Sequence, residues 1–139
     1  YDLCGGPLEG REIKAVIPGG SSVPILTREE AEGAIMDYEG FVASGTMLGS
    51  GGVIVFDDRQ DMVRQIARLT RFYAHESCGQ CTPCRVGCEK AVKLMQSESW
   101  DQPLLGELCT AMQDASICGL GQAAPNPILM TMKHFSDEI

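Results

Sequence analysis

Apolar residues recur at helical spacing in the part of the chain that follows Asp57. A first helix is predicted over residues 60–74, with Asp57 and Asp58 available to cap it. Three more helices are predicted after it, one starting near Pro103 and the last with Asn126 as N-cap and Pro127 as first residue. The apolar stripes expected to face the core are, helix by helix, Met62, Val63, Ile66, Leu69, Thr70 and Tyr73; Cys88, Ala91, Val92 and Met95; Leu105, Leu108, Cys109 and Met112; and Ile128, Leu129, Met132 and Phe135. Four helices of about three turns with short connections are typical of a small bundle.

The preceding residues are patterned differently. Eleven of the sixteen glycines fall in residues 1–52, and they separate two β-like runs at 13–17 and 53–56. Two short strands do not make a stable sheet on their own. We therefore expect an α+β chain in which residues 1–57 are the tail of a β-containing domain whose beginning is missing, followed by a helical domain over residues 58–139. The lack of an initiating Met likewise predicts that the chain was cut from a longer one.

Composition and charge exclude several classes of partner. The longest apolar run, "VIVF" at 53–56, is far too short to span a bilayer, and the first ten residues lack the features of a secretory signal. A net charge of −8 argues against nucleic acids and anionic membrane surfaces, because both are bound by clusters of Lys and Arg. No nucleic-acid binding and no direct membrane insertion are expected.

The seven cysteines are unevenly distributed, since six of them lie between residues 78 and 118. A secreted disulfide scaffold would spread an even number through the chain. Without a signal segment, reduced thiols and a cytoplasmic location are the better expectation.

Three of these cysteines form the pattern C-x-x-C-x-x-C, at Cys78, Cys81 and Cys84. A loop of this period can present three thiolates to three irons of a cubane cluster, with the fourth ligand supplied from elsewhere in the chain. Cys118 is the best candidate for the fourth ligand, because it lies off any helical stripe, in a loop with Gly119 and Gly121 where backbone can approach a cluster closely.

The other cysteines have a different setting. Cys88 and Cys109 lie on apolar helix faces, where free cysteine behaves as a small hydrophobic residue, and Cys4 is isolated among turn glycines. A dithiol redox centre at Cys81 and Cys84 is disfavoured, because such a motif is expected between a strand and a helix, whereas here the predicted helix 60–74 precedes it. A four-cysteine zinc site stays open, although zinc usually takes its ligands as two separated pairs.

The sequence also resembles a known family. "HESCGQCTPCR" at 75–85, followed by "SICGLG" at 116–121, resembles the flavin-containing subunit, of roughly 51 kDa, of NADH-linked electron-transfer complexes. That family includes subunits of respiratory complex I, NAD-dependent formate dehydrogenases and bidirectional hydrogenases. "KAVIPGGSS" at 14–22 and "MLGSGGVIVFDD" at 47–58 are similar to its β-grasp domain of the soluble-ligand-binding type.

This resemblance implies a [4Fe-4S] cluster bound by Cys78, Cys81, Cys84 and Cys118 in a C-terminal four-helix bundle. It implies electron transfer between that cluster and FMN, which NADH reduces, with FMN and NAD bound upstream of the residues present here. The chain by itself is then expected to hold the cluster but to bind neither NADH nor FMN. The implied partners are the upstream part of the same subunit and other iron–sulfur subunits, including a catalytic one.

Within the family, "CRVG" at 84–87, the stretch 108–127 and "HFSDEI" at 134–139 look most like formate dehydrogenase and hydrogenase subunits, and formate dehydrogenase is preferred. The alternatives are the same subunit of complex I or of a hydrogenase. A zinc-stabilised module that docks a protein partner is the hypothesis from another class.

Overall fold

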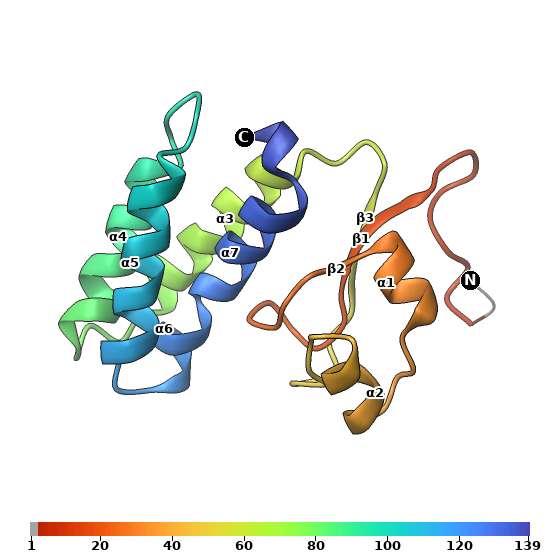
Figure 1. The fold of residues 1–139 in the computed structure, drawn as a ribbon, viewed down its shortest axis with the longest axis horizontal. Coiled ribbons are helices and arrows are strands. Elements are labelled where there is room, and N and C mark those ends of the chain that lie inside the picture. Colours follow the sequence, from red (N-terminus) through yellow and green to blue (C-terminus); the bar gives the residue numbers. More distant parts are fainter. Residues whose placement is uncertain (1–2) are drawn as a thin grey trace. The chain divides into compact units, whose positions relative to one another are not determined.

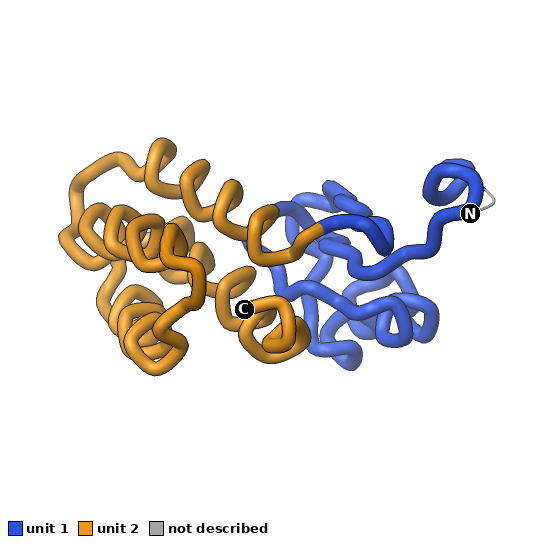
Figure 2. The backbone as a smooth tube through the Cα atoms, turned by 90° about the horizontal axis from the view of Figure 1, so that it is seen from above, with its two compact units in different colours: residues 1–60 blue, residues 61–139 orange. Residues whose placement is uncertain are grey.

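The computed structural model describes residues 3–139, and the chain divides into two compact units between Gln60 and Asp61 (Figure 2). The predicted boundary lies slightly earlier, between Asp57 and Asp58. The turn after Asp57 belongs to the first unit because the ammonium group of Lys14 donates a hydrogen bond to the Gln60 carbonyl at 2.7 Å.

The first unit contains a three-stranded antiparallel sheet in the order β2-β1-β3 (Figure 1). The strands are β1 (Ile13–Ile17), β2 (Leu26–Thr27) and β3 (Ile54–Asp57). On the central strand, Val16 lies opposite Leu26 of β2 and Val55 of β3. Both expected strands are therefore present, the second starting one residue later than predicted, but β2 was not predicted. A strand of two residues such as β2 is too short to show the alternation by which strands are recognised.

Two short helices of the first unit were also not predicted. These are α1 (Arg28–Gly33) and α2 (Tyr38–Ala43), each six residues long. The Thr27 side chain and the Glu30 carboxylate form a reciprocal capping box at the start of α1, and Asp37 accepts the Gly40 N–H at 2.6 Å at the start of α2. Helices of fewer than two turns show no apolar stripe, so periodicity does not reveal them. The α+β class is nevertheless confirmed.

The second unit is helical, and its four longer helices pack in a closed ring. These are α3 (Met62–Glu76), α4 (Thr82–Leu94), α5 (Gln102–Ala115) and α7 (Pro125–His134). Both α3 and α5 pack against α4 and against α7 (Figure 1). Every predicted stripe position is buried or half-buried, including Met62, Ile66, Leu105 and Ile128 in the core. Within residues 3–139, no helix is both long enough and apolar enough to cross a membrane.

The helix ends differ from the prediction. Asp61, not Asp57 or Asp58, caps α3 and accepts the Arg64 N–H at 2.9 Å. The Asp57 carboxylate instead accepts the Arg59 N–H in the turn after β3.

The start of the last long helix was predicted incorrectly as well. A short helix, α6 (Gly119–Ala123), was not predicted, and α7 follows it directly through Ala124, so α7 begins at Pro125 and Asn126 is not its cap. The chain then ends in the 3-10 turn η1 (Ser136–Glu138), whose Glu138 carboxylate accepts the Met62 N–H at 2.9 Å.

Candidate functional site

The cysteine loop, defined as residues 77–81, joins α3 to α4. Its Gly79 has φ +77°, a left-handed backbone conformation that favours glycine. The Arg85 guanidinium donates to the Gly79 carbonyl and, at 3.4 Å, to the Thr82 hydroxyl. Arg85 therefore ties the loop to the first turn of α4 rather than extending freely into solvent.

The three cysteines of the motif have different surroundings. Cys78 is exposed in the loop, Cys81 is the half-buried N-cap of α4, and Cys84 in the first turn is only 4% exposed. Cys81 and Cys84 thus lie at the start of a 13-residue helix, where the positive end of the helix dipole is located.

The fourth predicted ligand, Cys118, is exposed, but it does not lie in a plain loop as expected. It is the extended N-cap residue of α6, and its carbonyl accepts the Gln122 N–H at 3.3 Å. The glycines that suggested a loop, Gly119 and Gly121, are instead the first and third residues of this short helix.

The start of α6 lies against the start of α4. A Cβ atom placed on Gly121 would be 2.7 Å from the Cβ of Cys84 and 2.4 Å from the hydroxyl of Ser116, closer than real Cβ atoms approach. Leu120 packs on the same buried cluster as Cys81 and Cys84. The structure therefore brings the 116–121 segment onto two of the three motif cysteines.

Backbone N–H groups converge on the sulfur of Cys81. They lower the pKa of its thiol, the N–H of Ile117 having the largest effect and that of Cys84 the next largest. The Ser116 hydroxyl adds to this effect without forming a hydrogen bond of normal geometry. The residue next to Cys118 thus lies near Cys81, and these groups favour the charged form that binds metals.

Cys88 and Cys109 are buried in the helical core, as their apolar helix faces predict. Burial raises the pKa of each thiol to about 12, and for Cys88 the neighbouring Cys84 adds to the shift. Both stay protonated under ordinary conditions. Cys4 lies in the first unit and is exposed.

The raised pKa of Cys109 predicts a loss of stability in alkaline solution. The folded protein keeps this thiol neutral up to about pH 12, whereas in the unfolded chain it ionises near its ordinary pKa of 9.0. The contribution of the neutral Cys109 thiol to the free energy of unfolding is therefore fully present below pH 9. It declines as the pH rises from 9 towards 12, by up to about 1.4 kcal/mol per pH unit.

Urea denaturation at pH 8.5 and 10.5 measures this effect. Cys109→Ala should lower the free energy of unfolding at both pH values, but it should show a smaller decline between them than the unsubstituted chain. Equal declines of the free energy of unfolding in both proteins would show that Cys109 does not cause the loss of stability in alkaline solution.

A single metal ion is not prearranged in this structure. Within residues 3–139, no three side chains of His, Cys, Asp or Glu converge closely enough to hold one. Zinc would need bonds of about 2.3 Å to every coordinating sulfur, so its binding would require the thiols to move.

Whether an iron–sulfur cluster fits this site depends on the thiols available and on the polar groups around them. The predicted donor set consists of two exposed thiols, Cys78 and Cys118, and of two thiols at a helix start, Cys81 and Cys84. N–H groups approach the Cys81 sulfur, and a buried hydroxyl without a partner lies beside it. Thiolates with N–H and O–H groups around them suit an iron–sulfur cluster.

Two residues of this site were missed in the sequence. The Ser77 hydroxyl lies 3.3 Å from the sulfur of Cys84, and the Ser116 side chain is buried next to Gly121. Serines follow no periodicity that would mark them as site residues. The only signal in the sequence was their position just before Cys78 and Cys118.

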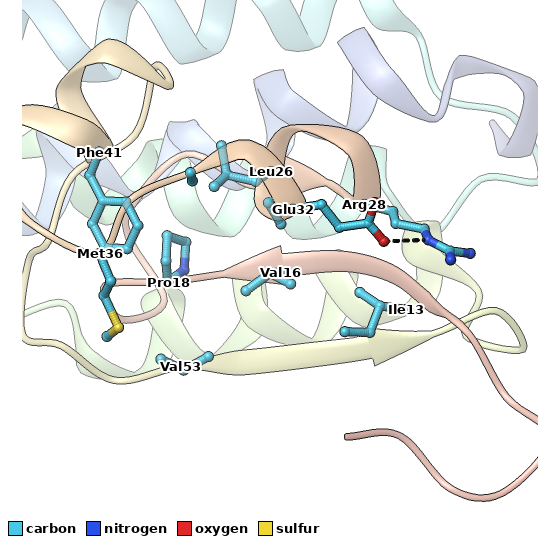
Figure 3. Close-up of a pocket in the computed structure, with 11 residues that line it drawn as sticks. Ile13, Val16, Pro18, Leu26, Arg28, Glu32, Met36, Phe41 and Val53 are labelled. Carbon is cyan, nitrogen blue, oxygen red and sulfur yellow. Dashed lines mark hydrogen bonds and ion pairs between the residues drawn. The ribbon is translucent and has the colours of Figure 1, made fainter. Parts of the chain in front are cut away.

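The first unit has an apolar groove of about 510 Å³ between α1 and the sheet (Figure 3). It is lined by Ile13, Val16, Pro18, Leu26, Ala31, Ala34, Met36, Phe41 and Val53, with Arg28 and Glu32 at one end. Those two side chains form an ion pair at 2.9 Å. None of these lining residues carries a thiol, hydroxyl or imidazole group.

Comparison with known proteins agrees with this arrangement of thiols. The family described as "NADH-ubiquinone oxidoreductase-F iron-sulfur binding region" matches residues 64–139. An NADH-quinone oxidoreductase subunit of Rhizobium meliloti (strain 1021) is 43% identical over 97% of this chain and 33% of its own length. The mitochondrial NADH-ubiquinone oxidoreductase 51 kDa subunit of Aspergillus niger is 41% identical over 98% of this chain and 29% of its own length.

A solved structure is similar too. The NAD+-reducing [NiFe]-hydrogenase in the air-oxidized state superposes with a TM-score of 0.78 at 34% identity, over 91% of this chain and 22% of the hydrogenase chain. The chain thus spans about a third of the curated relatives it matches, and less of the hydrogenase chain.

The names of these relatives favour some of the complexes predicted from the sequence over others. The preference for formate dehydrogenase gains no support from them, and the alternative, complex I or a hydrogenase, is better supported. The resemblance from which both were inferred is confirmed: this chain belongs to the family of the NADH-ubiquinone oxidoreductase-F iron–sulfur binding region, which is found in the 51 kDa subunit.

Proposed function

We propose that this chain binds a [4Fe-4S] cluster through Cys78, Cys81, Cys84 and Cys118, and that it carries electrons in an NADH-linked oxidoreductase of the complex I or NAD-reducing hydrogenase type. The observation that carries the proposal is the close packing of Gly121 on Cys84, where an added Cβ atom would lie 2.7 Å from the Cβ of Cys84. This packing brings the segment that contains Cys118 to the motif, although the two segments are far apart in the sequence.

The residues of the chain have separate tasks in this site. Cys81 and Cys84 present their sulfur atoms at the N-terminus of α4, the positive end of the helix dipole. Arg85 holds the cysteine loop through Gly79, which keeps Cys78 next to its partners. Cys118 closes the site from α6. Bound there, the cluster would accept one electron and pass one electron on, without making or breaking a substrate bond.

The wider assembly is proposed from the same family membership. FMN and NAD would be bound by another part of the subunit, with electrons passing between FMN and the cluster and then to other iron–sulfur subunits, including a catalytic one. Residues 1–57 would be part of a β-grasp domain, an identity that their small antiparallel sheet with α1 supports. The reduced thiols support the cytoplasm as the location.

Anaerobic purification followed by metal analysis tests the proposal. We expect a brown protein with about four iron atoms and four acid-labile sulfides per chain, which bleaches when dithionite is added. A colourless protein that contains zinc and no sulfide would contradict it and would indicate a zinc-stabilised interaction module.

A matched pair of cysteine variants tests the ligand set. Cys88→Ser and Cys109→Ser place a hydroxyl in the apolar core, which should destabilise the fold by about 1–3 kcal/mol. Since neither is a proposed ligand, the iron-to-protein ratio should stay that of the unsubstituted chain. Loss of iron from Cys88→Ser, combined with retention of iron by Cys118→Ser, would show that the motif is a self-contained four-cysteine loop.

A further inference from the structure

Ser116 is held in the helical unit with its hydroxyl unused by the protein. It is the C-cap residue of α5 and only 5% exposed. Its N–H donates to the Met112 carbonyl at 3.2 Å, and its carbonyl accepts from the Gln122 side chain at 2.9 Å. Among the described residues, its Oγ and the Trp100 Nε1 are the buried side-chain polar atoms with no hydrogen-bond partner. A buried hydroxyl without a partner is costly, so it calls for an explanation.

This hydroxyl lies beside cysteines of the proposed site. Ser116 Oγ and Cys84 Cβ both border the small space at Gly121, where a Cβ atom would meet each of them. Ser116 also lies beside Cys81. Ser116 is therefore next to two of the four proposed ligands.

A second hydroxyl contacts the same site from the cysteine loop. Ser77 Oγ lies 3.3 Å from the Cys84 sulfur, and it also accepts the Gly79 N–H at 3.4 Å. Since the oxygen is the acceptor for Gly79, its proton is available for the sulfur. A metal-bound thiolate has no proton to give, so in the loaded site the hydroxyl must be the donor.

Resting on the proposed function, we propose that Ser116 and Ser77 are positioning residues that donate hydrogen bonds to sulfur atoms of the cluster site and raise its reduction potential. With the cluster bound, Ser77 would donate to the thiolate of Cys84, and Ser116 would donate to the thiolate of Cys81. Reduction adds one electron and no proton to the site. Hydrogen bonds to sulfur favour the more negative, reduced state, because they become stronger as charge accumulates on the acceptor.

Redox titration of the anaerobically purified chain, followed by low-temperature EPR, tests this inference. Ser116→Ala and Ser77→Ala should each make the midpoint potential more negative while the iron-to-protein ratio stays unchanged. The two shifts should add in the double variant, since the hydroxyls serve different sulfurs. Thr131→Val is the matched control, because it also removes a buried hydroxyl of the helical unit, but one that donates to the Pro127 carbonyl at 2.8 Å. Its potential should be unchanged.

An unchanged potential in an iron-replete Ser116→Ala protein would overturn the role of Ser116. If that variant loses iron, Ser77→Ala decides the question, because an unchanged potential there would overturn the inference. A shift in the Thr131→Val control as large as in the serine variants would also overturn it, as the effect would then be structural. If the unsubstituted chain contains neither iron nor sulfide, the proposed function itself fails, and the inference fails with it.

Discussion

Cys118→Ser should remove the cluster and loosen the end of the helical unit. Cys118 is the one proposed ligand from outside residues 78–84, and a serine hydroxyl is a poor replacement for a thiolate. Loss of this ligand should weaken cluster retention by more than the roughly 10–100-fold that follows loss of an outer hydrogen-bond partner. Because metal binding contributes to folding when the unfolded chain has no site, the packing of α6 and α7 should loosen as well.

The measurements are iron and sulfide per chain, EPR after dithionite reduction, and hydrogen exchange of residues 116–134. Faster exchange in this segment together with lost iron is the expected result. Cys109→Ser is the control, since it introduces the same hydroxyl in the same unit at a buried position away from the ligands. A normal [4Fe-4S] signal from Cys118→Ser would mean that Cys118 is not a ligand.

Gly121→Ala should have the second-largest effect, because it separates α6 from α4. The new Cβ would lie 2.4 Å from Ser116 Oγ, 2.7 Å from Ser116 Cβ and 2.7 Å from Cys84 Cβ. The two Cβ atoms are short attachments to the backbone and cannot rotate away, so the helices must move apart. Overpacking of this kind costs about 1–3 kcal/mol. The displacement also carries Ile117 and Cys118 away from Cys81, so cluster content should fall too.

Gly119→Ala provides a closely matched control two residues earlier in the same helix. A Cβ atom on Gly119 meets nothing within 4 Å, and its backbone is not left-handed. We therefore expect its iron content and its free energy of unfolding by urea to stay near those of the unsubstituted chain. If Gly119→Ala and Gly121→Ala behave alike, the close approach of α6 to α4 is not what maintains the site.

Part of this architecture could be predicted from the sequence, because it depends on residues that are close together in the chain. The stripe from Met62 to Tyr73 revealed α3, since helical spacing repeats at every turn. Elements that are too short to repeat, namely β2, α1, α2 and α6, left no periodic trace. The start of α7 was misplaced for a related reason. Asn126 and Pro127 form a good capping signal, but α6 runs directly into α7 and leaves no place for a cap.

By itself, the sequence determined the α+β class, the four amphipathic helices and the local spacing of Cys78, Cys81 and Cys84. Each of these depends on residues within a few turns of one another, where backbone geometry is nearly constant. Tertiary structure alone decided that Ile117 lies near Cys81, that Gly121 packs on Cys84, and that Ser116 is buried beside them without a hydrogen-bond partner for its hydroxyl. These contacts join segments far apart in the chain, and they exist only because packing of the helix faces brings the starts of α4 and α6 together.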